Sequence, residues 1–231
     1  MPRAMADLHC HTSASFDSLS RPETVVRAAA QRGLTHLAIT DHDRIDAALA
    51  MRDAAPDGLS VIVGQEVRTR TGDLVALYVE RSIPPGLTMS DAALRVRDQG
   101  GIVGLAHPFD RFRAGAGRGG WEDELQAVLP LLDYVEAWNA RLMVGDGNRR
   151  AAELARHNGL PGVAVSDAHT VMEIGVAYTI FDSPIDTAAQ MRSALREIKL
   201  VSAHGSRLIR LGTPVAKLVQ RMRGNGRVRL A

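Results

Sequence analysis

The stretch "THLAITDHD", residues 35–43, joins a short apolar segment to three polar residues. The segment lacks the alternation of apolar and polar side chains that marks a strand with one face in water. Such a strand is typical of a parallel sheet or barrel that helices cover on the outside. A helical pattern at 45–54 follows directly. The stretch therefore predicts one strand–helix unit of an α/β protein, with polar side chains where the strand ends.

The same succession of apolar runs and helical patterns continues along the chain. Pro22 opens one helical pattern and Gly33 follows it, as expected for the two ends of a helix. The repetition predicts a single-domain α/β barrel with a mainly parallel sheet. Strands are predicted at 35–40, 59–67, 73–79, 101–107, 133–138, 161–166 and 175–181, and helices at 22–32, 45–54, 90–99, 121–131, 147–158 and 187–197.

The composition is that of a globular protein. The 231 residues are 45% hydrophobic and 23% charged, which is ordinary for a folded domain of barrel size. A single cysteine, Cys10, excludes an internal disulfide. No stretch has the length and apolarity of a membrane span or a signal peptide. A cytoplasmic protein without a membrane span is therefore expected.

Basic residues collect at the C-terminal end. The net charge is +2, yet no acidic residue follows Glu197 and the last 34 residues carry +8, which leaves −6 for the rest. We predict a barrel over 1–200 and a basic extension over 201–231, whose amphipathic helix packs on the body or a partner. A solvated helix is favoured, and a polyanion-binding tail is the alternative. The apolar face of the predicted helix comprises Val215, Leu218, Val219 and Met222.

Two histidines stand one residue apart in "DLHCHT", residues 7–12. In a strand, Asp7, His9 and His11 point to one face and Cys10 to the other. Two neutral imidazoles held side by side suit a divalent metal ion, because each offers a ring nitrogen. Taken alone, such a pair supports a structural role and metal ligation equally.

Other residues of metal-ligand type end several predicted strands. Each has a structural alternative: an aspartate can cap a helix or form a turn, and a histidine can be hydrogen-bonded in the core. In a parallel barrel, however, the carboxyl ends of the strands open onto one rim. Their shared position therefore favours one site. These residues are His42, Glu66, His107, Asp167 and His169, while Asp17 in "SFDS" can be an ordinary turn acid.

The combined motifs resemble the PHP family, the polymerase and histidinol phosphatase superfamily of metal-dependent phosphoesterases. They are "DLHCHTSASFDS", "ITDHD" with "GQEV", "AHP" and "SDAH", and the resemblance extends from Asp7 to about Phe181. It implies a distorted (β/α)7 barrel with two or three divalent ions, Mn, Zn or Fe, at the C-terminal rim of the strands. The ligands that it implies are His9, His11, Asp17, His42, Glu66, His107, Asp167 and His169.

One position departs from the family pattern. Many members have a histidine early in the strand after the ligand glutamate, where this chain has Asp73 in "GDLVAL". Either Asp73 substitutes as an oxygen ligand, or one metal position is weak or empty. The resemblance otherwise implies hydrolysis of a phosphate ester by metal-bound hydroxide.

Further residues are expected to support that chemistry. Asp41 and Asp43 flank His42 and can orient it or another ligand. Arginines near the rim can bind phosphate oxygens through their guanidinium groups, although solvated surface arginines are the equal alternative. The candidates are Arg44, Arg111, Arg113, Arg118 and Arg141.

Three functions fit these residues. The favoured one is hydrolysis of a small phosphomonoester or nucleotide. The second is a nuclease or nucleic-acid end-processing phosphodiesterase, with nucleic acid bound through the basic tail and affinity that falls steeply with salt. The third is a non-catalytic module stabilised by metal, which leaves no coordination position open for water.

Overall fold

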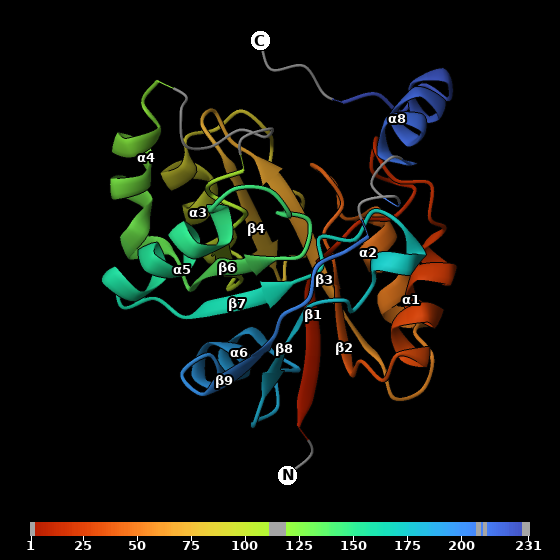
Figure 1. Cartoon of the computed structure of the whole chain (residues 1–231), viewed down its shortest axis with the longest axis horizontal. Helices are drawn as coiled ribbons and strands as arrows, with labels where there is room; N and C mark the ends of the chain where they lie inside the picture. Colours follow the sequence, from red (N-terminus) through yellow and green to blue (C-terminus); the bar gives the residue numbers. More distant parts are fainter. Residues whose placement is uncertain (1–2, 111–118, 207–208, 210–211, 228–231) are drawn as a thin grey trace.

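The computed structural model describes residues 3–110, 119–206, 209 and 212–227. Within them, nine strands form one sheet that curls into a nearly closed barrel, with seven α-helices around it (Figure 1). This confirms the predicted α/β barrel. The strands are β1 (Ala4–Cys10), β2 (His36–Ile39), β3 (Ser60–Arg68), β4 (Asp73–Leu77), β5 (Ile102–Leu105), β6 (Tyr134–Asn139), β7 (Gly162–Val165), β8 (Tyr178–Phe181) and β9 (Ile198–Val201).

The helices begin and end close to the predicted residues. Pro22 occupies a first-turn position of α1, where the missing N–H costs no hydrogen bond. The side chain of Thr88 caps α3 by accepting from the backbone N–H of Asp91. The helices are α1 (Pro22–Gln31), α2 (Asp46–Ala54), α3 (Met89–Arg97), α4 (Trp121–Val128), α5 (Gly147–His157), α6 (Ala188–Ala194) and α8 (Gly212–Met222).

The sheet is less parallel than predicted. Its order is β7-β6-β5-β4-β3-β2-β1-β8-β9, and four of the eight neighbouring pairs are antiparallel. Residues 69–72 alone link β3 to β4, which is too short for a parallel crossover and reverses β4. As a result Asp73, at the start of β4, pairs with Arg68 at the end of β3. Asp73 therefore lies at the same rim as the carboxyl end of β3.

The barrel closes where β1 meets the residues that follow β7. The backbone N–H of His11 donates to the carbonyl oxygen of Ala168 at 2.8 Å. The buried carboxylate of Asp7 accepts from the backbone N–H groups of Ser166, at 3.0 Å, and Gly175, at 2.9 Å. These bonds bring the histidines of β1 beside the residues that follow β7, and they give Asp7 a structural role.

The strands are buried on both faces, as the unbroken apolar runs predicted. Leu37 and Ile39 of β2 belong to one apolar cluster, and Ala38 between them belongs to a second. Cys10 is fully buried in the first cluster and donates to the carbonyl oxygen of Ala38. In the described parts of the chain, no helix is long and apolar enough to cross a membrane.

Helix α8 lies at the end of the barrel where β1 ends (Figure 1). Its contact with the body uses a different face from the predicted apolar one. Ala216 and Gln220 are buried, whereas Val215 is 57% and Leu218 is 60% exposed. The side-chain amide of Gln220 donates to three backbone carbonyl oxygens in the loop after β1, those of Ser13 (2.7 Å), Ser15 (3.0 Å) and Ser18 (2.7 Å).

Gln220→Glu is expected to release α8 from the barrel. The new carboxylate would face three carbonyl oxygens with no proton to donate, and a buried unpaired charge is costly. We expect faster tryptic cleavage after Arg221 with little change in the melting temperature of the barrel. Leu218→Glu, which places the same charge on the exposed face of the same helix, is the control. Equal cleavage rates in the two variants would contradict the anchoring role of Gln220.

Candidate metal centre

The eight ligand residues implied by the motifs lie together at the rim. They form three groups of nitrogen and carboxylate oxygen atoms, and within each group the atoms lie within 4.8 Å of one another. His11 belongs to the first two groups and His9 to the last two, so the three groups adjoin. The groups are His11, Asp17, His42 and His169; His9, His11 and Asp167; and His9, Glu66 and His107.

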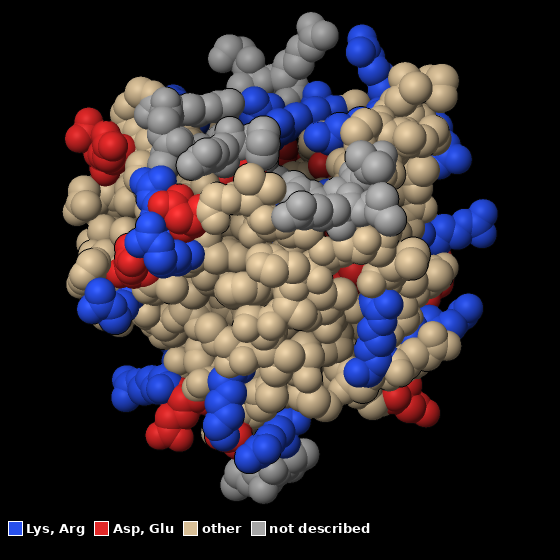
Figure 2. Space-filling view, in the orientation of Figure 1, with Lys and Arg blue, Asp and Glu red and all other residues tan. Residues whose placement is uncertain are grey.

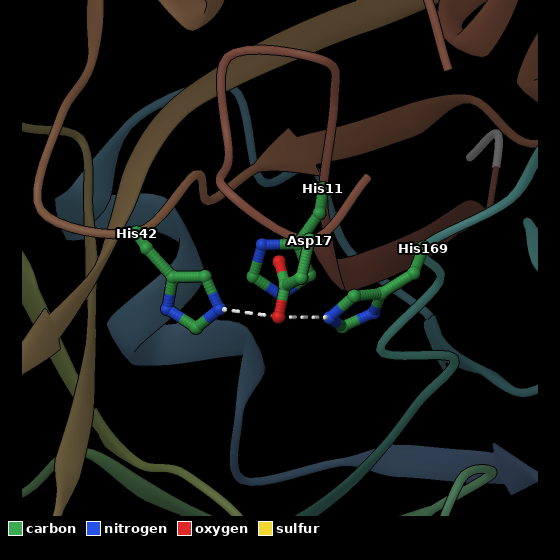
Figure 3. Close-up of side chains that lie close together, drawn as sticks. All are labelled: His11, Asp17, His42 and His169. Carbon is green, nitrogen blue, oxygen red and sulfur yellow. Dashed lines mark ion pairs between the residues drawn. The ribbon is translucent and has the colours of Figure 1, made fainter. Parts of the chain in front are cut away.

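Asp17 is the central residue of the first group (Figure 3). Its Oδ2 lies 3.2 Å from Nε2 of His169 and 3.4 Å from Nε2 of His42. Both nitrogens are buried and form no hydrogen bond with the described residues, and the same holds for Oδ1 of Asp17. The three side chains thus converge with ligand atoms that remain available.

Glu66 is the carboxylate that lies among four histidines of the site. Its Oε2 lies 3.3 Å from Nε2 of both His9 and His11. The same oxygen lies 3.1 Å from Nδ1 of His42, and Oε1 lies 2.9 Å from Nε2 of His107. Glu66 is fully buried, so one carboxylate contacts all four imidazoles.

The donor set fits divalent metal ions. Two ligand atoms that each sit about 2.1 Å from a tetrahedral ion lie about 3.4 Å apart. Most of the separations within the groups are close to this value, including 3.1 Å between Nε2 of His9 and Nε2 of His11. Imidazole nitrogens and carboxylate oxygens together suit Zn, Mn and Fe. The residues present therefore fit the ions that the sequence motifs imply.

The charges around the three ligand groups favour a bound cation. Burial lowers the pKa of His11, but its hydrogen bonds with Asp167 and Glu66 outweigh burial and bring the pKa to about 9. Burial also lowers the pKa of His9, and the charge of Glu136 with two further carboxylates raises it well above its ordinary value. Burial lowers the pKa of His169 to about 3, which keeps this imidazole neutral and able to act as a ligand.

Backbone strain is concentrated at the same strand ends. Asp43, His107 and Asp167 have φ values of 56°, 25° and 52°, in the left-handed region that residues other than glycine rarely adopt. Such conformations persist only where the surroundings impose them, and they cluster at functional sites. Here they lie at or next to proposed ligand residues after β2, β5 and β7.

Glu136 of β6 is a supporting residue that the motif analysis did not single out. Its Oε1 accepts from Nδ1 of His9 at 2.6 Å, and its Oε2 accepts from the backbone N–H of His107 at 2.9 Å. The side chain of Asn139 donates to both Glu136 and Asp167 at 3.1 Å. In the sequence, Glu136 could have been recognised as an acid inside the apolar run "DYVEAW", just as Glu66 is an acid inside an apolar run.

Glu136→Gln is expected to weaken metal binding about 10- to 100-fold, the usual cost of losing a carboxylate that orients a ligand histidine. The amide keeps the volume of the side chain but cannot accept at both positions. Chelator competition on metal-loaded protein measures the change. Glu153→Gln, at a partly exposed position of α5 outside the ligand groups, is the control, and equal affinities in the two variants would contradict the role of Glu136.

Asp41 is linked through Ser15 to the ring of His11 and to the backbone of the adjacent His42, whose N–H donates to Ser15 Oγ at 3.2 Å. The carboxylate of Asp41 accepts from the hydroxyl of Ser15 at 2.7 Å, and Ser15 Oγ lies 3.1 Å from Nδ1 of His11. Asp43 accepts from the backbone N–H of Arg68 at 3.0 Å, which fixes the turn beyond His42. Both aspartates thus support the site through neighbouring residues, Asp41 through Ser15 and Asp43 through the backbone of Arg68.

The predicted phosphate-binding arginines have different surroundings. Arg44 forms two hydrogen bonds with Asp46 at the edge of the site. Arg141 is buried in an ion pair with Glu173 at 3.1 Å, and Glu173 accepts from the backbone N–H of His169, so the geometry favours a structural role. Arg111, Arg113 and Arg118 lie outside the described residues.

Asp73 is buried beside the third group without belonging to it. Burial raises the pKa of its carboxyl group, and the nearby charge of Glu66 raises it further. Asp73 thus lies near Glu66, opposite Arg68 at the end of β3. Its role as a ligand stays a prediction.

Fold and site together define an α/β barrel protein with a centre for divalent metal ions at one rim. The model of the PHP domain matches residues 7–107, and the PHP-associated model matches residues 145–200. The uncharacterized protein MJ0417 of Methanocaldococcus jannaschii is 30% identical over 175 residues, which are 76% of this chain and 69% of that protein. The chain therefore belongs to the PHP family of metal-dependent phosphoesterases.

Solved structures share the fold at low sequence identity. A two-domain protein of Bacteroides vulgatus, containing a predicted PHP-like metal-dependent phosphoesterase, superposes with a TM-score of 0.72 at 19% identity. The match covers 93% of this chain and 70% of that chain. The lesion-specific endonuclease PfuEndoQ of Pyrococcus furiosus gives a TM-score of 0.60 at 17% identity over 86% of this chain and 58% of that chain.

Proposed function

We propose that the protein hydrolyses a small phosphomonoester or nucleotide at the three adjoining ligand groups. The observation that carries the proposal is the sharing of His9 and His11 between groups, which would let two or three cations bind side by side. Closely spaced ions are the arrangement used for in-line displacement at phosphorus. Mn, Zn and Fe are the ions that this mixed donor set accepts.

Ions bound there would lower the pKa of a coordinated water and neutralise charge on phosphoryl oxygens. Residues of the chain hold the ligand histidines in position. Glu136 holds His9 in one orientation, and Ser15 does the same for His11. Burial raises the pKa of Asp17, but the neighbouring His169 and His42 lower it well below its usual value. Asp17 therefore stays a carboxylate throughout the physiological range.

The proposal is tested by assaying p-nitrophenyl phosphate and a panel of nucleotides after loading with Mn, Zn or Fe. We expect hydrolysis of at least one monoester by the wild-type protein and a loss of at least about a hundredfold in Asp17→Asn. Asp57→Asn, at an exposed position, is the control. Absence of turnover on every ester with every metal would contradict the proposal.

A second candidate is a phosphodiesterase that acts on nucleic acid. It is supported by the basic residues within 212–227, which lie beside the rim, and by the fold shared with a lesion-specific endonuclease. Lys and Arg side chains gather along the upper edge of the molecule, the side on which the rim lies (Figure 2). Preferred hydrolysis of bis(p-nitrophenyl) phosphate, with oligonucleotide affinity that falls steeply with salt, would favour this candidate over the first.

A further inference from the structure

A pocket of about 350 Å³ adjoins the proposed metal centre. One wall contains His42, which also belongs to the Asp17 group. The remaining lining residues are Ala14, Phe16, Asp43, Arg44, Asp46 and residues 225–227 near the C-terminus. Its volume lies within the range of about 300–1,000 Å³ that is usual for small-molecule sites. A substrate held at the centre would therefore border on the C-terminal segment.

The C-terminal segment is fixed at this pocket by specific contacts. The side-chain amide of Asn225 donates to the carbonyl oxygen of Ala14 at 2.9 Å, next to the bonds of Gln220. The guanidinium carbon of Arg227 lies 5.3 Å from the ring centroid of Phe16, within cation–π range. Arg227 is thus held at the pocket by an aromatic ring, which leaves its N–H groups able to bind an anion.

Arg44 and Arg227, the two arginines that line the pocket, differ in whether a carboxylate neutralises their charge. Arg44 is paired with the carboxylate of Asp46, at 2.6 Å from Nε. Within the described part of the chain, Arg227 forms no ion pair. It lines the same pocket as His42 of the Asp17 group. Arg227 is therefore an unneutralised cation beside the proposed metal centre.

We propose that Arg227 binds a phosphate oxygen of the substrate, so that the basic C-terminal segment completes the active site of the barrel. This inference rests on the proposed hydrolysis of a phosphate ester. A guanidinium group suits the task because its planar N–H donors match phosphate oxygens. The sequence alone gives no sign of this role, because Arg227 lies 185 positions after His42 and outside the stretch that carries the family motifs.

The test compares Arg227→Gln with Arg221→Gln, which removes the same charge from an exposed position of α8. We expect Arg227→Gln to raise KM for p-nitrophenyl phosphate about tenfold with kcat nearly unchanged, because a charge-assisted hydrogen bond made equally to substrate and transition state is lost. Arg227→Lys should recover part of the affinity. Arg221→Gln should behave as the wild type.

Calorimetric titration of the manganese-loaded protein with inorganic phosphate provides a readout that needs no turnover. The same tenfold weakening in Arg227→Gln is expected. If no ester is hydrolysed but this difference remains, the proposed function fails while the anion site stands. Equal phosphate affinity in the wild type and Arg227→Gln, or no phosphate binding by the wild type, would overturn the role of Arg227.

Discussion

Glu66→Gln is expected to lower the rate of p-nitrophenyl phosphate hydrolysis by at least about a hundredfold, more than the loss of a residue that only supports a ligand. Glu66 is the carboxylate that contacts His9, His11, His42 and His107. The amide removes the charge and one of the two acceptor oxygens. Metal content per chain should fall in the same variant.

Initial rates and elemental analysis of one preparation measure both effects. Glu80→Gln is the control, because Glu80 is an exposed carboxylate paired with Arg52 just after β4. A Glu66→Gln protein that retains its metal and hydrolyses the ester at the wild-type rate would show that this carboxylate is not part of the centre.

Gly104→Ala is expected to destabilise the barrel by about 3 kcal/mol, the upper end of the usual cost of overpacking. A Cβ atom at this position in β5 would overlap the ring of Tyr134 in the neighbouring strand β6. Tyr134 is fully buried, so its ring has no free space into which to move. Both strands would have to separate.

Urea denaturation of the purified proteins measures the change in the free energy of unfolding. Gly212→Ala is the control, since no atom of the described residues lies within 4 Å of a Cβ atom at that position. A change below about 0.5 kcal/mol for Gly104→Ala, as for an ordinary surface substitution, would contradict the packing described for β5 and β6.

Local patterns predicted most of the elements and brought the ligand residues to one rim. The run 35–40 became β2, Pro22 began α1, and the motif residues other than Asp17 lie near the end of a strand or shortly after it. These features depend on side-chain burial and helix punctuation, which a short stretch of sequence determines. Strand direction depends on connection length as well, and the short link between 59–67 and 73–79 was the available sign that β4 is reversed.

Features that depend on distant partners were not predicted. β9 is a partly exposed edge strand of four residues with a weak apolar pattern. The contact face of α8 is set by Gln220, whose amide meets the backbone of a loop about 200 positions earlier. Glu136 acquires its role only when β6 lies beside the histidines of β1. A single sequence gives the residue types, while the fold decides which of them meet.

The most direct test of the account is the number of metal ions bound per chain. Elemental analysis after reconstitution with Mn, Zn or Fe should give two or three ions in the wild type. His9→Ala should bind fewer, because His9 belongs to two of the three groups. A wild-type protein that binds none of these metals after reconstitution would contradict the account.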